Sequence, residues 1–165
     1  MAARGQPPGG GQGSLRRPPP PPKITYQQPE SWQTGELVRT RGGISIPRAA
    51  AFLVTEGSDQ VEITVTSLPA RGGSDPEYVA ANVNRWRGQL RLPPIAADEL
   101  QLESIEFAGL NASYVEIVGQ HESILGVIAV NDNVSWFTKL QGSVDLAIRE
   151  RERFKEFVSS IQFKD

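Results

Sequence analysis

Alternating apolar and polar residues near the middle of the chain predict an antiparallel β-sheet. Val61, Ile63 and Val65 fall on one side of such a segment, and Glu and Thr residues fall on the other. This two-residue period is typical of a strand with one buried face. A polar turn at residues 57–59 precedes the segment, so we expect it to pair with a strand at residues 51–55.

Four more strand candidates follow in the second half of the chain, separated by short polar turns. They are Ile105 to Phe107, Tyr114 to Val118, Ile124 to Val130 and Val134 to Leu140. The lengths of the intervening turns suit hairpins. The third candidate is apolar at every position, so we expect other parts of the protein to cover it on both faces.

A different period, with apolar residues three or four positions apart, predicts a helix before these four strands. Asp75 can cap it, Pro76 suits its first position, and Pro93-Pro94 ends it. Its apolar stripe consists of Val79, Val83, Trp86 and Leu90. A second, short helix is expected at residues 96–100.

The last helix is predicted to start after Ser143 as its cap and to run to about Ile161. Its inner face is expected to consist of Val144, Ala147, Ile148, Phe154, Phe157, Val158 and Ile161. We expect Glu150, Glu152, Arg153 and Lys155 to face outward, with opposite charges three residues apart. Arg151 falls on the inner stripe, where its stem can cover apolar surface or its guanidinium can pair with an acid.

Strands and helices therefore alternate around one antiparallel sheet. Since one strand is expected to be covered on both faces, helices should lie on both sides of the sheet. The predicted fold class is α+β, arranged as an α/β/α sandwich. We assign it to a single domain at residues 24–165.

Residues 1–23 are expected to form a disordered arm in front of this domain. They are rich in Pro and Gly, and Leu15 is their one large apolar side chain after Met1. The consecutive prolines from Pro18 to Pro22 favour an extended spacer.

Charge and composition exclude several classes of function. The arm is basic, with four positive side chains and no acid, whereas the whole chain has a net charge of −2, which leaves −6 for residues 24–165. Because phosphate binding needs clustered Lys and Arg, we expect no nucleic-acid partner. The absence of cysteine excludes disulfides and thiolate chemistry. No apolar run approaches the roughly 20 residues that cross a bilayer, so no transmembrane span is expected.

No catalytic or metal-binding constellation is recognisable. The single histidine, His121, falls in a predicted turn, and one imidazole cannot hold a metal without further convergent ligands. The sequence contains neither a nucleophile-elbow serine nor a glycine-rich phosphate loop. We therefore expect a protein that is not an enzyme and has no cofactor, with His121 on a surface loop.

The polar positions of the helix at residues 77–91 are the most unusual feature, because they hold Asn, Arg and Gln in place of Glu or Lys. Asn82, Arg85 and Gln89 recur at helical spacing. The candidate binding residues are Asn84, Arg85, Arg87 and Gln89, together with Lys139 on the last strand. Arginine offers forked donors for carboxylates or phosphates. The alternative is a solvated face, or hydrogen bonds that fix nearby loops. Trp136, in contrast, is expected in the core.

Three stretches resemble known proteins. Residues 26–32, with Pro29 and Trp32, are similar to the opening strand of PsbP-like domains. Residues 136–142 and the helix after them look like the last strand and helix of those domains. The run from Asn82 to Leu90, followed by Leu92-Pro93, is similar to a set of uncharacterised bacterial envelope proteins. Together the resemblance spans nearly all of residues 24–165.

The resemblance implies an α/β/α sandwich that is usually not an enzyme and acts by contacting another protein. It also implies export and often a lipid attached near the N-terminus, which would place the protein in the cell envelope or periplasm. The chain departs from this pattern, since it has no apolar signal stretch and no lipobox cysteine. We expect a monomeric protein-interaction domain that is tethered by its proline-rich arm. The alternative function is binding of small anions or peptides by the helix at residues 77–91.

Overall fold

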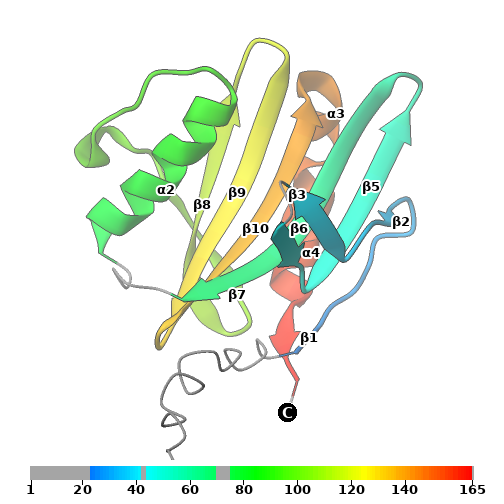
Figure 1. Ribbon diagram of the computed structural model, residues 1–165, viewed down its shortest axis with the longest axis horizontal. Coiled ribbons are helices and arrows are strands. Elements are labelled where there is room, and N and C mark those ends of the chain that lie inside the picture. Colours follow the sequence, from blue (N-terminus) through cyan, green and yellow to red (C-terminus); the bar gives the residue numbers. More distant parts are fainter. Residues whose placement is uncertain (1–22, 42–43, 70–74, 165) are drawn as a thin grey trace, which may run out of the picture.

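The computed structural model describes residues 23–41, 44–69 and 75–164, so all of the expected arm at residues 1–23 except Lys23 lies outside the described residues. Its centre is a seven-stranded antiparallel sheet with the strand order β2-β5-β6-β10-β9-β8-β7 (Figure 1). The strands of this sheet are β2 (Gln33–Thr34), β5 (Ala50–Glu56), β6 (Asp59–Pro69), β7 (Glu103–Phe107), β8 (Leu110–Val118), β9 (Glu122–Asn131) and β10 (Val134–Ser143). Two small antiparallel pairs accompany it: β1 (Ile24–Thr25) with β11 (Gln162–Phe163), and β3 (Val38–Arg41) with β4 (Ile44–Pro47).

The predicted strands are all present. β5 and β6 form the predicted hairpin, with Thr55 opposite Gln60 across the turn. At that turn Gly57 has a φ of 62°, a conformation that residues with a side chain rarely adopt. From β7 to β10 each strand pairs with the next, and β10 also pairs with β6, which joins the two halves of the sheet.

Helices lie on both faces of the sheet. α2 (Pro76–Gln89) covers one face, and α3 (Val144–Arg149) and α4 (Arg151–Ser160) cover the other (Figure 1). A single 3₁₀ turn, η1 (Ala97–Glu99), follows α2 at the predicted second helix. β9 is buried on both faces, because Leu125 and Val127 face α4 whereas Ile124 and Ile128 face α2. The predicted α+β fold class and α/β/α sandwich are therefore confirmed.

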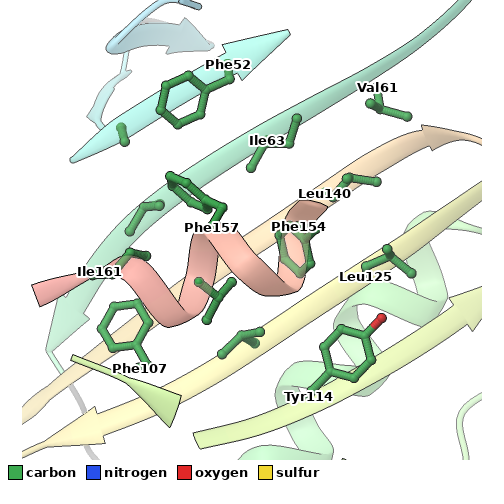
Figure 2. Packing of buried hydrophobic residues seen from close by; sticks show 14 of the residues in the cluster. Phe52, Val61, Ile63, Phe107, Tyr114, Leu125, Leu140, Phe154, Phe157 and Ile161 are labelled. Atoms are coloured by element: carbon green, nitrogen blue, oxygen red, sulfur yellow. The ribbon is translucent and has the colours of Figure 1, made fainter. Parts of the chain in front are cut away.

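The larger core fills the space between the sheet and α4 (Figure 2). Phe157 of α4 packs against the rings of Trp32 and Phe52, with ring centroids 5.1 and 5.3 Å apart. Trp136 is buried in the same cluster, as expected, beside Phe107 and Phe163. Figure 2 shows Phe154 and Phe157 pointing from α4 towards the strands.

The smaller core lies under α2. The carboxylate of Asp75 accepts a hydrogen bond from the amide of Glu77 at 3.1 Å, so the predicted cap is present. The predicted stripe packs on β8, β9 and β10, and the indole of Trp86 lies directly on Gly126 of β9. A Cβ at that glycine would overlap with the six-membered ring of the indole. Asn82, expected on the polar side, is buried, and its side-chain amide donates to the carbonyl of Tyr78 at 2.9 Å.

The predicted last helix is wrong in four details. It is divided into α3 and α4 at Glu150, and Ser143 makes no side-chain capping hydrogen bond. Glu150, expected outside, is only 4% exposed, whereas Ile148, expected inside, is 43% exposed. The reason is that the buried stripe runs through Leu146, Glu150 and Phe154 at four-residue spacing, and a charged residue at its centre concealed it in the sequence.

Two hydrogen bonds satisfy the buried carboxylate of Glu150. The indole N–H of Trp32 donates to Oε1 at 2.8 Å, and the guanidinium of Arg153 donates to Oε2 at 2.6 Å. A buried carboxylate without such partners would be very unfavourable. The Glu150 side chain thereby connects the start of the domain to its final helix.

Candidate functional site

α2 covers only part of its face of the sheet. The residues beneath it belong to β8, β9 and β10. At the opposite edge of the sheet, β2 pairs with β5, and the amide of Gly35 continues this pairing by donating to the carbonyl of Ala51 at 2.8 Å. Beside α2 lies a groove of about 860 Å³ along β6 and β10. We call it the sheet-face groove.

Side chains of β6 and β10 form the floor of the sheet-face groove. They are Thr64, Thr66 and Leu68 of β6, and Phe137, Lys139 and Gln141 of β10. In the register of the two strands, Phe137 lies opposite Thr66 and Lys139 lies opposite Thr64. At about 3.3 Å per residue, the floor from Phe137 to Gln141 is about 13 Å long, the length of about four residues of an extended chain.

α2 supplies one wall of the groove. The guanidinium of Arg85 lies over the ring of Phe137, 5.7 Å from its centroid. One helical turn further on, Gln89 accepts a hydrogen bond at 3.0 Å from the ammonium group of Lys139. Trp86 packs edge-on against Phe137 and closes the base of this wall.

Arg48, which directly follows β4, forms part of the opposite wall. Its side chain is only 9% exposed, and its guanidinium donates to Oε2 of Glu62 at 3.2 Å and to the carbonyl of Glu36 at 3.3 Å. At the end of the groove near this pair, Gln141 donates to Glu122 at 3.1 Å. This wall is therefore held in place by an ion pair inside the groove.

The structure separates the five candidate binding residues into two groups. Arg85, Gln89 and Lys139 meet at the sheet-face groove. Asn84 points to the other side of α2, where its side-chain amide exchanges two hydrogen bonds of 2.9 Å with the backbone of Ile95. Arg87 donates to the carbonyl of Pro93 at 2.7 Å. These two side chains fix the loop that follows α2.

The sequence did not point to the wall around Arg48 or to the β6 side of the floor. Arg48 lies far from α2 along the chain, and pairing of the strands brings the two together. The one available signal was the polar side of the alternating β6 segment, where Glu62, Thr64 and Thr66 take every second position.

A second cluster of polar side chains lies between α4 and the β7–β8 hairpin. The hydroxyl of Tyr114 donates to Glu116 at 2.6 Å, and Arg151 donates to the same carboxylate at 2.9 Å. Lys155 pairs with Glu103 at 3.2 Å and lies over the Tyr114 ring. Arg151 thus pairs with an acid, one of its two predicted arrangements.

Electrostatics make this second cluster a poor candidate for proton transfer. Burial, and then the hydrogen bond to Glu116, raise the pKa of Tyr114 well above its usual range, so its hydroxyl stays protonated. The same carboxylate raises the pKa of Arg151. Paired in this way, the cluster attaches α4 to the edge of the sheet.

The described part of the chain gives little support for a metal site, a role for its histidine or a membrane-spanning helix. No three His, Cys, Asp or Glu residues in it are grouped closely enough to hold a metal ion. His121 is exposed in the turn between β8 and β9. Within the same ranges, no helix is both long and apolar enough to cross a bilayer.

No family model and no curated protein matches this chain. Several solved structures are similar to it. The cyanobacterial PsbP protein (CyanoP) of Synechocystis sp. PCC 6803 has a TM-score of 0.51 and 14% identity, over 86% of each chain. LpqN of Mycobacterium tuberculosis, described as involved in cell envelope biogenesis, has a TM-score of 0.47 and 14% identity, over 90% of this chain and 87% of LpqN. A Bacteroides thetaiotaomicron structure has a TM-score of 0.45 and 11% identity, over 86% of this chain.

The fold is PsbP-like. The similarity to CyanoP extends over most of both chains and agrees with the antiparallel sheet and its two helical layers. At 14% identity the similarity concerns the fold alone. The chain spans about half of the Bacteroides thetaiotaomicron protein, 45% of its length.

Proposed function

We propose that this protein is a non-catalytic interaction domain that binds an extended segment of another protein in the sheet-face groove. The observation that carries the proposal is the stretch of sheet on β6 and β10 that α2 leaves uncovered. Its floor combines hydroxyl and amide groups with the apolar side chain of Leu68, which is 46% exposed, whereas Phe137 is 5% exposed. Such a mixed lining can bind backbone groups and side chains of a polypeptide together.

The contacts of the acidic groups favour binding over catalysis. In the groove, Glu62 is paired with Arg48, and Glu122 accepts a hydrogen bond from Gln141. A general base or nucleophile needs a partner arranged for proton transfer as well as space for the reacting atom. The ion pair at Glu62 instead serves to hold the wall in place.

Location and tethering belong to the same proposal. We infer a single domain at residues 24–165 that stands in the cell envelope behind its proline-rich arm. The support is the sequence resemblance and the run from Pro18 to Pro22. Cell fractionation of the natural host, with an antibody against the domain, tests the location. Recovery in the cytosolic fraction alone would contradict it.

A groove-blocking substitution tests the proposed function. Thr66→Trp fills the floor of the groove, whereas Thr55→Trp makes the same change on β5, outside the groove lining. Selection from a phage-displayed random peptide library should yield peptides that bind the natural protein and Thr55→Trp but not Thr66→Trp. Circular dichroism checks that both variants are folded.

Two results would count against the function. One is a selection that enriches no peptide, and the other is a set of peptides that bind Thr66→Trp as well as the natural protein. Either result would leave the groove without a role in polypeptide binding.

Binding of a small anion is the second candidate function. Arg85 and Lys139 approach the groove from the same side, which favours a compact anion between them. A ligand at 100 times its dissociation constant stabilises the folded state by about 2.7 kcal/mol. A thermal-shift screen with phosphate, sulfate and citrate should therefore raise the midpoint in the natural protein but not in Arg85→Gln. Unchanged midpoints would eliminate this candidate.

A further inference from the structure

The sheet-face groove is positive within an acidic domain. Its charged lining consists of Arg48, Arg85 and Lys139 against Glu62 and Glu122, so positive charges outnumber negative ones. Residues 24–165 as a whole have a net charge of −6, because the basic arm accounts for four of the positive charges. The sign of the charge in the groove is thus opposite to that of the domain around it.

The basic side chains of the groove lie at two different places along it. Arg48 is held against Glu62 at the end that Gln141 and Glu122 also occupy. Arg85 and Lys139 lie nearer the middle and the Phe137 end, on the α2 side. The α2 side of the groove therefore carries an arginine that lies apart from the Arg48–Glu62 pair.

The guanidinium of Arg85 is placed where it could pair with a carboxylate of a ligand. Within the described ranges, no carboxylate lies within ion-pair distance of its guanidinium, and its contact is the face of the Phe137 ring. A guanidinium that lies over a ring face makes a cation–π contact and can still use its fork of N–H groups as donors. A carboxylate can accept two of these N–H groups in parallel, which is the strongest geometry for this pair.

Apolar contacts lie beside this positive region. Leu68 is exposed at the end of the floor, two residues beyond Thr66, and Thr66 lies opposite Phe137. Two residues of a strand span about 7 Å. An extended peptide with its acid near Arg85 would therefore place a side chain about two residues away against Leu68.

We propose that the bound segment carries an Asp or Glu side chain that pairs with Arg85, and an apolar residue about two positions away that contacts Leu68. This inference rests on the proposed function, since it specifies the polypeptide that the groove takes. The net charge of the domain argues against a polyanion such as nucleic acid, which the surrounding acidic surface would repel. One carboxylate on a short segment is affected mainly by the local charge of the groove.

Matched peptides test the inference. Peptides selected for groove-dependent binding are synthesised with an amidated C-terminus, so that side chains supply the only carboxylates, and each is paired with its Asp→Asn or Glu→Gln counterpart. Isothermal titration measures both against the natural protein and Arg85→Gln. Arg91→Gln is the control, because it removes the same charge just after α2 and outside the groove lining.

A charge-assisted hydrogen bond in a groove is worth about tenfold or more in affinity. We expect the acid-to-amide change to weaken binding to the natural protein and to Arg91→Gln by about this factor. The same change should have under about a twofold effect in Arg85→Gln, because the partner of the carboxylate has been removed. Affinity for the acidic peptides should also fall as salt rises.

The results separate the inference from the function on which it rests. Groove-dependent peptides that lack acids, or that bind equally well as amides, would overturn the inference and leave the function standing. An equal loss in Arg91→Gln would overturn it too, since net charge alone would then explain the binding. If no peptide depends on Thr66, both proposals fail.

Discussion

The two faces of the sheet are built from the same strands but are covered to different extents. On the α4 face, side chains from β5 to β10 meet α3 and α4 in one continuous apolar cluster. On the α2 face, the apolar cluster involves β8, β9 and β10, and the surface over β6 is open and polar. Ile63 and Thr64 are neighbours in the chain, yet one lies in the core and the other on the groove floor. Alternation along one strand thus separates the residues for stability from those for binding.

The two helical layers also dock by different means. α4 inserts Phe154 and Phe157 among the rings on its side of the sheet. α2 instead lays a single indole, that of Trp86, on a glycine of β9. The aromatic cluster can bury much area from several elements, whereas the α2 contact depends on one close approach. Substitutions on the two faces should therefore differ in how much they lower the free energy of unfolding and in the physical cause of the loss.

The largest effect is expected on the α4 face. Phe157→Ala removes a ring that is 1% exposed and packs against Trp32, Phe52 and Tyr26. Loss of a buried Phe side chain costs about 3–5 kcal/mol in the free energy of unfolding. Urea unfolding followed by circular dichroism measures the loss. A loss below about 1 kcal/mol would mean that this cluster is not the main source of stability.

The close approach under α2 should give the next largest effect. Gly126→Ala places a Cβ where the Trp86 ring lies, and such overpacking costs up to about 3 kcal/mol. Gly88→Ala is the matched control, since a Cβ there meets nothing within 4 Å, and it should stabilise the helix by about 0.5–1 kcal/mol. Urea unfolding of both variants tests the pair. Similar values for the two glycines would show that the indole moves aside at little cost.

The buried carboxylate at Glu150 should give an intermediate effect on the α4 face. Glu150→Ala leaves the buried indole N–H of Trp32 without its acceptor, which costs about 2 kcal/mol. Glu150→Gln keeps an acceptor oxygen and should cost less. Thermal unfolding of the two variants measures the difference. Equal losses would indicate that charge, and not the hydrogen bond to the indole, is what the site requires.

Much of the fold could be predicted because its signals are local. The period of two in β6 and the cap and stripe of α2 depend on neighbours in the chain, and the structure agrees with both. Glu150 shows the limit of such signals. A charged residue on a buried stripe is indistinguishable from an outward one until its partner, here Trp32, is known.

The candidate site could be predicted only in part, because a groove is a property of packing. Arg85 and Lys139 were identified by residue type and helical or strand position, whereas Arg48 comes near them only through the order of strands in the sheet. Asn84 and Arg87 have the same residue types as groove side chains, but the loop after α2 uses their hydrogen bonds. The very short strands β1, β2 and β11 have too few residues to show a period.

The smallest effect on stability is expected at the groove itself. Arg85→Gln removes an exposed cation from the face of Phe137, a contact that contributes about 0.5–1 kcal/mol, and surface changes of this kind usually stay near the lower value. The variant should therefore unfold at nearly the same urea concentration as Arg91→Gln. Peptide affinity, in contrast, should differ between the two by about tenfold. On the α2 face, Arg85→Gln should thus alter peptide binding with little change in stability. On the α4 face, Phe157→Ala should mainly lower stability. If Arg85→Gln instead lowered stability as much as Gly126→Ala does, the guanidinium of Arg85 would belong to the α2 core. The groove residues would then contribute to stability as well as to binding, and the contrast between the two faces would not hold.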